Sequence, residues 1–298
     1  MRALLKPFAL SVALALPMQP PRAQDGVVDP DVIALCERIS GKLASVGNEE
    51  CLERRLVDSG GRAVSGAPII FKEYPPLQTR KPLGRVLLIG GIHGDEYSSV
   101  SIVFKWLKTL DQHHSGLFHW RMVPLLNPDG LLRTEPQRMN ANGVDLNRNF
   151  PMPEWEQATQ TYWVAKTNRN PRRFPGKSAL SEPETRWLVR EIDAFTPDVI
   201  VAVHAPHGIV DYDGPKDGPY KLGRLYLSLL GTFPGSLGNY AGIQRSTPVV
   251  TIELPFAGIM PKPGEVAEIW RDLVQWLTRN LPEYRQAAGQ PVQETEPS

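Results

Sequence analysis

The chain has 298 residues, of which 41% are hydrophobic, and its 33 basic and 32 acidic side chains leave a net charge of +1. The hydrophobic share is typical of a globular protein that buries a core. Because the charge is balanced and no block of lysine and arginine occurs, nucleic acid is not expected as a partner.

Residues 1–23 have the features of a secretory signal peptide. Arg2 and Lys6 precede a short apolar run, and a polar segment follows that ends at Ala23. The alternative is an apolar helix of the folded domain, but Pro17 and two further prolines would end it. We therefore predict cleavage near Ala23 and a periplasmic or secreted protein. The apolar run is too short for a membrane span, so no span is expected after the signal is removed.

Residues 24–66 are predicted to form a segment of helix and turns before the main domain. Apolar side chains at helical spacing indicate a helix that ends near Gly47, and glycines mark turns after it. The only two cysteines are Cys36 and Cys51. In an exported protein such a pair favours a disulfide worth ~3 kcal/mol, with two buried thiols as the alternative.

Residues 67–282 alternate between short apolar runs and amphipathic stretches. The expected strands are 68–74, 84–89, 118–127, 197–204 and 247–255, and the expected helices are 98–110, 181–195 and 264–281. The second helix opens with Ser181 and Glu184 in the relation of a capping box. This alternation predicts an α/β fold in a single domain, with a mixed, largely parallel β-sheet flanked by helices on both faces. Residues 283–298 are expected to form a polar C-terminal tail.

The stretch "GGIHGDEYSS", residues 90–99, follows a predicted strand and places His93 and Glu96 three residues apart. Its glycines disfavour a helix, so the two side chains are expected on an open loop. A phosphate-binding loop is the weaker reading, because no Gly-Lys-Ser/Thr ending occurs and Asp95 and Glu96 would repel phosphate. A simple turn remains the alternative.

His204 ends another predicted strand and is the candidate third ligand. Two histidines and one carboxylate form a common catalytic zinc site with an open position. His207, three residues later, could compete for the same role. The remaining histidines are expected at the surface: His113, His114 and His119.

Glu253 lies on an apolar strand, where an inward carboxylate is costly unless it has a task such as general base. A salt-bridged strand glutamate is the alternative. Between these elements, the segment 127–151 is rich in asparagine and arginine. There Arg138 and Arg148 could bind an oxyanion or a carboxylate and Asn147 could add a donor, whereas a solvated loop would explain either arginine alone.

In this order the motifs resemble the zinc carboxypeptidase family, the carboxypeptidase A-like enzymes. The similarity runs through "HGDE", "NPDG", two arginines ten residues apart, "GVDLNRNF", a strand that ends in a histidine, and "TIELP". It covers most of residues 67–282 and implies a zinc carboxypeptidase-like (phosphorylase/hydrolase-like) fold. It also implies one zinc ion per chain, bound by His93, Glu96 and His204.

The same resemblance assigns the other site residues of an enzyme that removes a C-terminal residue from peptides. Arg138 would polarise the scissile carbonyl, while Asn147 and Arg148 would hold the terminal carboxylate of the substrate. Glu253 would act as general base and then as general acid. Asp145 would orient the first histidine ligand.

The stretches "NFPMPEW", "SEPETRWLV", "HAPHGIVDYDGP" and "PGSLGNYAG" further resemble the murein peptide amidase A branch of that family. Members of this branch cut the bond between γ-D-glutamate and meso-diaminopimelate in cell-wall peptides, so a murein-derived peptide is the expected substrate. The signal peptide is a departure, because the best-known members are cytoplasmic. The alternatives are a general carboxypeptidase, an aspartoacylase-like zinc deacylase of N-acyl amino acids, and a wall-binding module without catalysis.

Several features are left open by the sequence. Asp211 and Asp213 follow the third ligand and could meet the extra ammonium group of diaminopimelate, although Asp-Gly-Pro sequences usually form turns. No tyrosine clearly matches the one that closes over substrate in digestive carboxypeptidases, with Tyr226 and Tyr240 as candidates. A monomer or a small homo-oligomer is expected.

Overall fold

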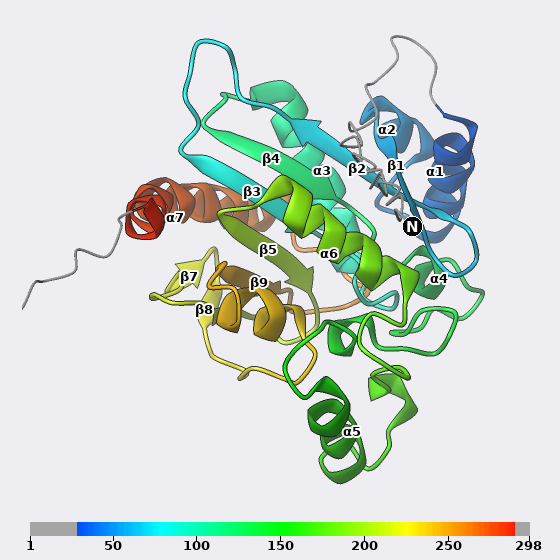
Figure 1. Cartoon of the computed structure of the whole chain (residues 1–298). Helices are drawn as coiled ribbons and strands as arrows, with labels where there is room; N and C mark the ends of the chain where they lie inside the picture. Colours follow the sequence, from blue (N-terminus) through cyan, green and yellow to red (C-terminus); the bar gives the residue numbers. More distant parts are fainter. Residues whose placement is uncertain (1–28, 290–298) are drawn as a thin grey trace, which may run out of the picture.

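The computed structural model describes residues 29–289 (Figure 1). The predicted signal peptide, residues 1–23, lies outside this range. Within it, no helix has both the length and the apolar composition that a membrane span requires.

In residues 29–289 the core of the fold is a nine-stranded mixed sheet with the order β1-β2-β4-β3-β5-β9-β6-β8-β7. The strands are β1 (Val57–Arg62), β2 (Pro68–Tyr74), β3 (Gly84–Ile89), β4 (Phe118–Val123), β5 (Val199–His204), β6 (Ile209–Asp213), β7 (Lys221–Leu222), β8 (Leu225–Leu227) and β9 (Val249–Glu253). The four central strands, β4, β3, β5 and β9, are parallel to one another. Strands β1 and β2 at one side, and β6 next to β9, pair antiparallel. The prediction of a mixed α/β sheet is confirmed, and its parallel part is the centre.

Helices cover both faces of the sheet, as predicted. One layer is formed by α1 (Pro30–Lys42), α2 (Asn48–Glu53), α3 (Tyr97–His113) and α7 (Pro263–Gly289), and the other by α6 (Pro183–Phe195) with the π-helical turn η3 (Gly238–Ile243). The protein has two hydrophobic cores, one on each face of the sheet, and strand β3 shows why. Val86 and Leu88 face the first layer, whereas Leu87 and Ile89 face the second, because successive side chains of a strand point to opposite faces.

The remaining short elements lie in the connections. They are α4 (Pro128–Leu131), η1 (Leu146–Arg148), α5 (Trp155–Ala165) and η2 (Pro171–Arg173). Figure 1 shows α5 projecting away from the sheet beneath α6.

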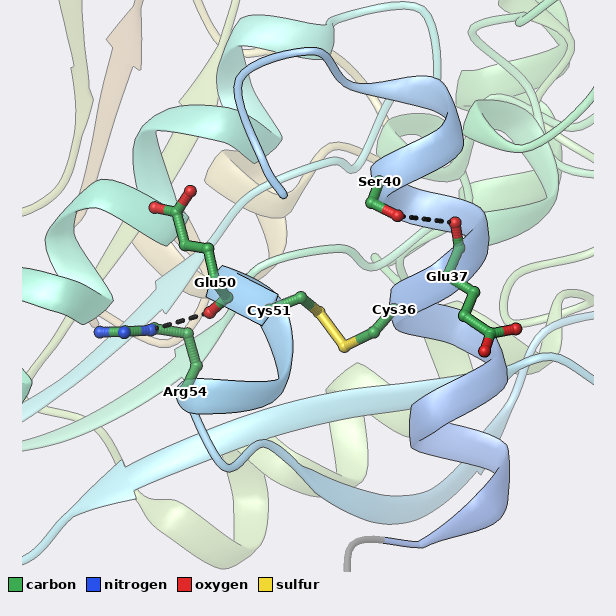
Figure 2. The surroundings of a disulfide bond; sticks show 6 residues. All are labelled: Cys36, Glu37, Ser40, Glu50, Cys51 and Arg54. Atoms are coloured by element: carbon green, nitrogen blue, oxygen red, sulfur yellow. Dashed lines mark hydrogen bonds between the residues drawn. A yellow bond between two sulfur atoms is a disulfide. The ribbon is translucent and has the colours of Figure 1, made fainter. Parts of the chain in front are cut away.

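The disulfide expected between the two cysteines is present. Cys36 on α1 and Cys51 on α2 are joined with a Cα–Cα separation of 5.6 Å, and both are fully buried (Figure 2). The bond ties two short helices that together cover one end of the first core.

Two glycines allow the loop after β3 to pack tightly. Gly91 has φ of +62°, a conformation that side chains disfavour. At Gly94 a Cβ atom would lie 2.1 Å from the carbonyl carbon of Gly130, so the loop "HGDE" and the loop "NPDG" touch through their backbones. Any larger residue at position 94 would separate the two loops.

Three local predictions were wrong. Strand β1 occupies a segment where turns were expected, so three strands precede the loop at residue 90. The capping box at α6 does not form, because the carboxylate of Glu184 is fully buried and accepts hydrogen bonds from the Val64 amide at 3.3 Å and from Asn140 Nδ2 at 3.1 Å. The hairpin of β1 and β2 brings a competing donor to the start of α6. Helix α7 also continues through Gly289, into the segment expected as a tail.

Candidate active site

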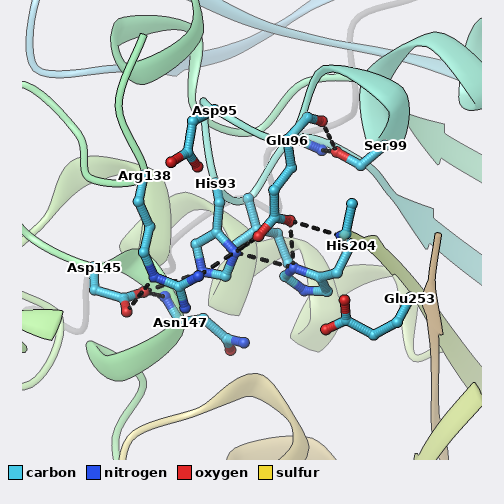
Figure 3. Close-up of polar contacts among 12 residues, drawn as sticks. His93, Asp95, Glu96, Ser99, Arg138, Asp145, Asn147, His204 and Glu253 are labelled. Atoms are coloured by element: carbon cyan, nitrogen blue, oxygen red, sulfur yellow. Dashed lines mark hydrogen bonds and ion pairs between the residues drawn. The ribbon is translucent and has the colours of Figure 1, made fainter. Parts of the chain in front are cut away.

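The candidate metal ligands meet at the carboxyl ends of two neighbouring parallel strands. His93 and Glu96 follow β3, and His204 ends β5. His93 Nδ1 lies 2.8 Å from Glu96 Oε1, and His204 Nδ1 lies 3.0 Å from Glu96 Oε2 and 3.1 Å from His93 Nδ1 (Figure 3). All three side chains are at most 5% exposed. The strand ends therefore bring two imidazoles and one carboxylate to one point.

These three groups fit a zinc ion. Tetrahedral zinc with N and O ligands separates neighbouring ligand atoms by about 3.3 Å, a few tenths of an ångström more than the distances observed here. The carboxylate of Asp145, which can only accept, lies 3.1 Å from His93 Nε2 and would hold the ring proton on Nε2 when Nδ1 binds a metal. The lone pair of His93 Nδ1 is thereby directed at the other two groups. Donor types, burial and tautomer all suit a divalent metal.

Asp145 holds two site residues at once. Its Oδ1 faces His93, and its Oδ2 accepts a hydrogen bond from Arg138 Nε at 2.8 Å. Asp145 is fully buried, which by itself would raise its pKa, but the charge of Arg138 and the contact with the His93 ring hold the pKa of this carboxyl well below its usual range. The group therefore stays ionised and acts as a fixed anion behind the site.

Glu253 lies beside the candidate third ligand because of strand register. In the parallel pair β5 and β9, His204 is the direct neighbour of Glu253. The Glu253 side chain is 7% exposed and lines the cavity, and its nearest donor is the backbone amide of His207 at 3.5 Å. Within residues 29–289 this long contact is the one hydrogen bond to the carboxylate, which leaves it available to a substrate or a water molecule.

Arg148 and Asn147 point donors into the same cavity. Arg148 is 3% exposed, stacks on Phe233 at 4.5 Å, and bonds the Asn147 carbonyl at 2.6 Å. Its Nε is buried and has no partner among the described residues. Burial, with the nearby positive charges, lowers the pKa of Arg148 to about 10. Asn147 Oδ1 accepts from the Leu237 amide at 2.8 Å, which leaves the amide nitrogen for a ligand. A buried guanidinium with an unpaired donor favours an anionic ligand.

One cavity of about 410 Å³ connects these groups, a size suited to a short peptide segment. The predicted residues that line it are His93, Glu96, Arg138, Asn147, Arg148, His204 and Glu253, and Asp145 lies behind them.

Asp211 and Asp213 also line the cavity, on the strand that pairs with β9. Asp211 Oδ1 accepts from the Leu230 amide at 3.0 Å, and Asp213 Oδ1 accepts from the Thr232 hydroxyl. Burial and the neighbouring Asp211 raise the pKa of Asp213. Two carboxylates in the wall of one cavity would both be stabilised by a cationic group of a ligand.

Sequence reasoning missed several cavity residues. Arg172, Arg173 and Phe233 line the wall, and Arg172 forms an ion pair with Asp95 at 2.7 Å. The only sequence signal for the two arginines was the run "RNPRRF", whose position opposite the strand ends is set by long-range packing, and Phe233 had no signal.

The tyrosine candidates are not found at the cavity. Within residues 29–289, neither Tyr226 nor Tyr240 lines it: Tyr226 is 53% exposed on β8, and Tyr240 packs in the second core.

The other histidines have separate environments. His207 lines the cavity, but it does not belong to the group of ligand atoms. His119 was expected at the surface and is instead half-buried, with Nε2 2.5 Å from Glu73. The carboxylate comes from β2, which pairs with His119's own strand, so it could not be found nearby in sequence.

Comparisons with known proteins agree with this site. Residues 59–213 match the model of the zinc carboxypeptidase family. Murein peptide amidase A of Escherichia coli (strain K12) is 36% identical over 202 residues, which cover 65% of this chain and 79% of the relative. Murein peptide amidase A of Vibrio campbellii is 32% identical over 204 residues, covering 66% and 78%.

Solved structures show the same fold. The crystal structure of the murein-tripeptide amidase from Escherichia coli O157 matches with a TM-score of 0.52 at 28% identity, covering 74% of this chain and 89% of that one. Carboxypeptidase A of Helicoverpa armigera shares the fold at 19% identity, with a TM-score of 0.55 and coverage of 78% and 68%. The chain therefore belongs to the zinc carboxypeptidase family of peptide hydrolases.

Proposed function

We propose that the protein hydrolyses the amide bond between γ-D-glutamate and the C-terminal meso-diaminopimelate of murein peptides. The observation that carries this proposal is the buried Arg148, whose Nε lacks a partner in the described chain and which faces the candidate metal ligands across one cavity. A guanidinium in that position suits the carboxylate of a substrate's last residue. The relatives named as murein peptide amidases support the choice of peptide.

We assign the metal to His93, Glu96 and His204. Zinc bound by two imidazoles and one carboxylate supplies Lewis-acid polarisation of a carbonyl and makes water more acidic. The family match and the donor geometry described above support this assignment.

The chain's own groups would then carry the proton and the developing charge. Glu253 takes a proton from the attacking water and delivers it to the leaving amine. Arg138, fixed by Asp145, donates to the carbonyl oxygen as negative charge grows there in the transition state. Asn147 and Arg148 bind the terminal carboxylate, which an internal peptide bond lacks, so the cleaved bond is the last one.

The two aspartates in the wall would recognise the leaving residue. Diaminopimelate carries an additional ammonium group at its far end, and Asp211 and Asp213 offer carboxylates in the cavity for it. Replacing both by asparagine should raise KM for a diaminopimelate peptide. The same pair should leave KM unchanged for a peptide whose last residue has no side-chain amine. Equal effects on both substrates would reject this recognition.

The proposed reaction is tested by mass spectrometry of products. The mature, zinc-loaded protein is incubated with L-Ala-γ-D-Glu-meso-diaminopimelate and, separately, with α-linked tripeptides. We expect free diaminopimelate from the first and much slower release from the second. Release of ordinary C-terminal amino acids alone would place the protein among general carboxypeptidases, and cleavage of N-acyl amino acids alone would indicate a deacylase.

The Glu253→Gln variant tests the assignment of the base. It should bind zinc stoichiometrically, as measured by elemental analysis, and lose nearly all turnover, because glutamine cannot accept the proton. Glu156→Gln, an exposed position on α5, is the matched control and should keep wild-type kcat. Near-normal kcat in the Glu253→Gln protein would show that another group is the base.

We further propose a periplasmic location, which rests on the predicted signal peptide in residues 1–23. Expression in a Gram-negative host should yield periplasmic protein whose mass corresponds to cleavage near Ala23. Recovery of the full-length chain in the cytoplasm alone would reject it.

A further inference from the structure

Arg173 is a third arginine in the wall of the cavity, and its backbone is firmly held. It ends the short helix η2, which is capped by a hydrogen bond from the Arg172 amide to Asn170 Oδ1 at 3.0 Å. The next carbonyl, that of Phe174, accepts from the amide of Asp145 at 2.8 Å. Asp145 also holds His93 and Arg138, so the residue next to Arg173 is tied to the group that positions both of them.

The side chain of Arg173 has no protein partner within residues 29–289. Its neighbours each do: Arg172 forms an ion pair with Asp95, and Arg138 bonds Asp145. Arg173 is half-buried and lines the cavity, yet none of the hydrogen bonds or ion pairs of the described chain involves its guanidinium. Partial burial and the positive charge of Arg138 lower the pKa of Arg173. Holding such a cation among others is unfavourable unless an anion joins it.

An ordinary peptide offers no anion for this position. Its terminal carboxylate is matched by Asn147 and Arg148, and its scissile carbonyl by Arg138. A γ-linked glutamyl residue differs, because its α-carboxylate is not used in the peptide bond. That carboxylate remains free on the acyl side, separated from the scissile carbonyl only by the residue's own short side chain.

We propose that Arg173 binds the free α-carboxylate of the γ-glutamyl residue and thereby selects γ-linked over α-linked substrates. This inference rests on the proposed function and adds a residue that binds the substrate on the acyl side of the scissile bond. Arginine suits the role, since its planar donors match a carboxylate in a two-point contact.

The test uses two substrates that differ only in this carboxylate. They are L-Ala-γ-D-Glu-meso-diaminopimelate and the same peptide with the glutamyl α-carboxylate converted to its amide. For wild-type protein kcat/KM should be higher with the acid. In the Arg173→Gln variant, kcat/KM for the acid should fall about 10- to 100-fold, the range expected for a charge-assisted contact, and the amide should change about 3-fold at most. The preference between the two substrates should disappear.

Two variants control for charge and folding. Arg172→Gln removes the same charge one residue earlier, but its guanidinium is already paired with Asp95, so the acid-to-amide preference should persist. Arg173→Lys keeps a charge without the planar fork and should retain part of the preference. Thermal unfolding of each variant checks that the fold is intact.

The outcomes separate the two proposals. If wild-type protein releases no diaminopimelate from either peptide, the proposed function fails and this inference falls with it. If wild-type protein cleaves both and Arg173→Gln slows both equally, the function stands and the role of Arg173 is rejected. A third peptide with lysine in place of diaminopimelate lacks the distal carboxylate of the leaving residue. Suppose that Arg173→Gln lowers kcat/KM for the amide peptide but not for the lysine peptide. Arg173 then binds the leaving residue, and the glutamyl assignment is wrong.

Discussion

Glu184 gives the folded protein a specific pH dependence. Burial raises the pKa of Glu184 from its ordinary value of 4.5 to about 7, although hydrogen bonds from Asn140 and from the Val64 amide oppose this shift. The acidic groups that face it are Asp129, which bonds Ser65, and Glu182, which shares the Asn140 amide. The substitution Glu184→Gln replaces the carboxyl by a neutral group of the same size.

The sign and size of the effect follow from linkage. The folded protein holds this proton more tightly than the unfolded chain does, so the free energy of unfolding falls as pH rises from 4.5 towards 7 and levels off above 7. Between pH 5 and pH 8 the loss amounts to about 2.5 kcal/mol for this group. Glutamine does not titrate, so it removes this loss. Any cost of placing an amide beside Asn140 is the same at both pH values and cancels in the comparison.

Urea unfolding of both proteins at pH 5 and pH 8, with saturating zinc, measures the effect. We expect the free energy of unfolding of Glu184→Gln, relative to wild type, to increase by about 2 to 3 kcal/mol between the two pH values. Glu37→Gln, an exposed position on α1, should show no such change. If the difference in free energy of unfolding between Glu184→Gln and wild type were the same at both pH values, the reasoning that Glu184 is protonated in the folded protein at pH 5 and loses its proton by pH 8 would be refuted.

Two further predictions concern the covalent and steric framework. The double variant Cys36→Ala with Cys51→Ala should lower the free energy of unfolding by roughly 3 kcal/mol and leave kcat unchanged, because neither cysteine lines the cavity; unchanged urea stability would contradict this. Gly94→Ala should lose stoichiometric zinc in elemental analysis, since its methyl group would meet the Gly130 backbone, whereas Gly41→Ala, with open space around it, should keep zinc. Normal zinc content in Gly94→Ala would show that the two loops can separate without disturbing the ligands.

The strand-end residues could be predicted from the sequence because two simple patterns combine. Short apolar runs bounded by glycine or proline mark buried strands, and parallel strands bring their carboxyl ends to one edge. His93, Glu96, His204 and Glu253 all follow or end such runs. For this reason the predicted strands of the central sheet and the helices that cover it are confirmed.

The residues that escaped prediction depend on packing between distant segments. Glu184 matches a capping box by spacing, and only the hairpin of β1 and β2 buries it. Arg173 lies in a charged loop that would be exposed if the loop did not bond Asp145. In both cases the environment comes from a partner more than 25 residues away. Sequence periodicity reports local structure, so it carries no information about such contacts.

Asp145 explains how these distant segments act as one site. Its two carboxylate oxygens hold His93 and Arg138, its carbonyl accepts from the Arg148 amide at 2.9 Å, and its own amide donates to the loop that carries Arg173. A fully buried carboxylate is costly to desolvate, and the cost is offset only because every polar group of the residue has a partner. The same contacts fix the relative positions of His93, Arg138 and Arg148 and of the loop that carries Arg173, which are the residues proposed to bind the metal, the carbonyl oxygen and the two carboxylates. A substitution elsewhere in the site could displace one of these groups alone. A substitution of Asp145 would displace all of them, because each depends on one of its polar atoms.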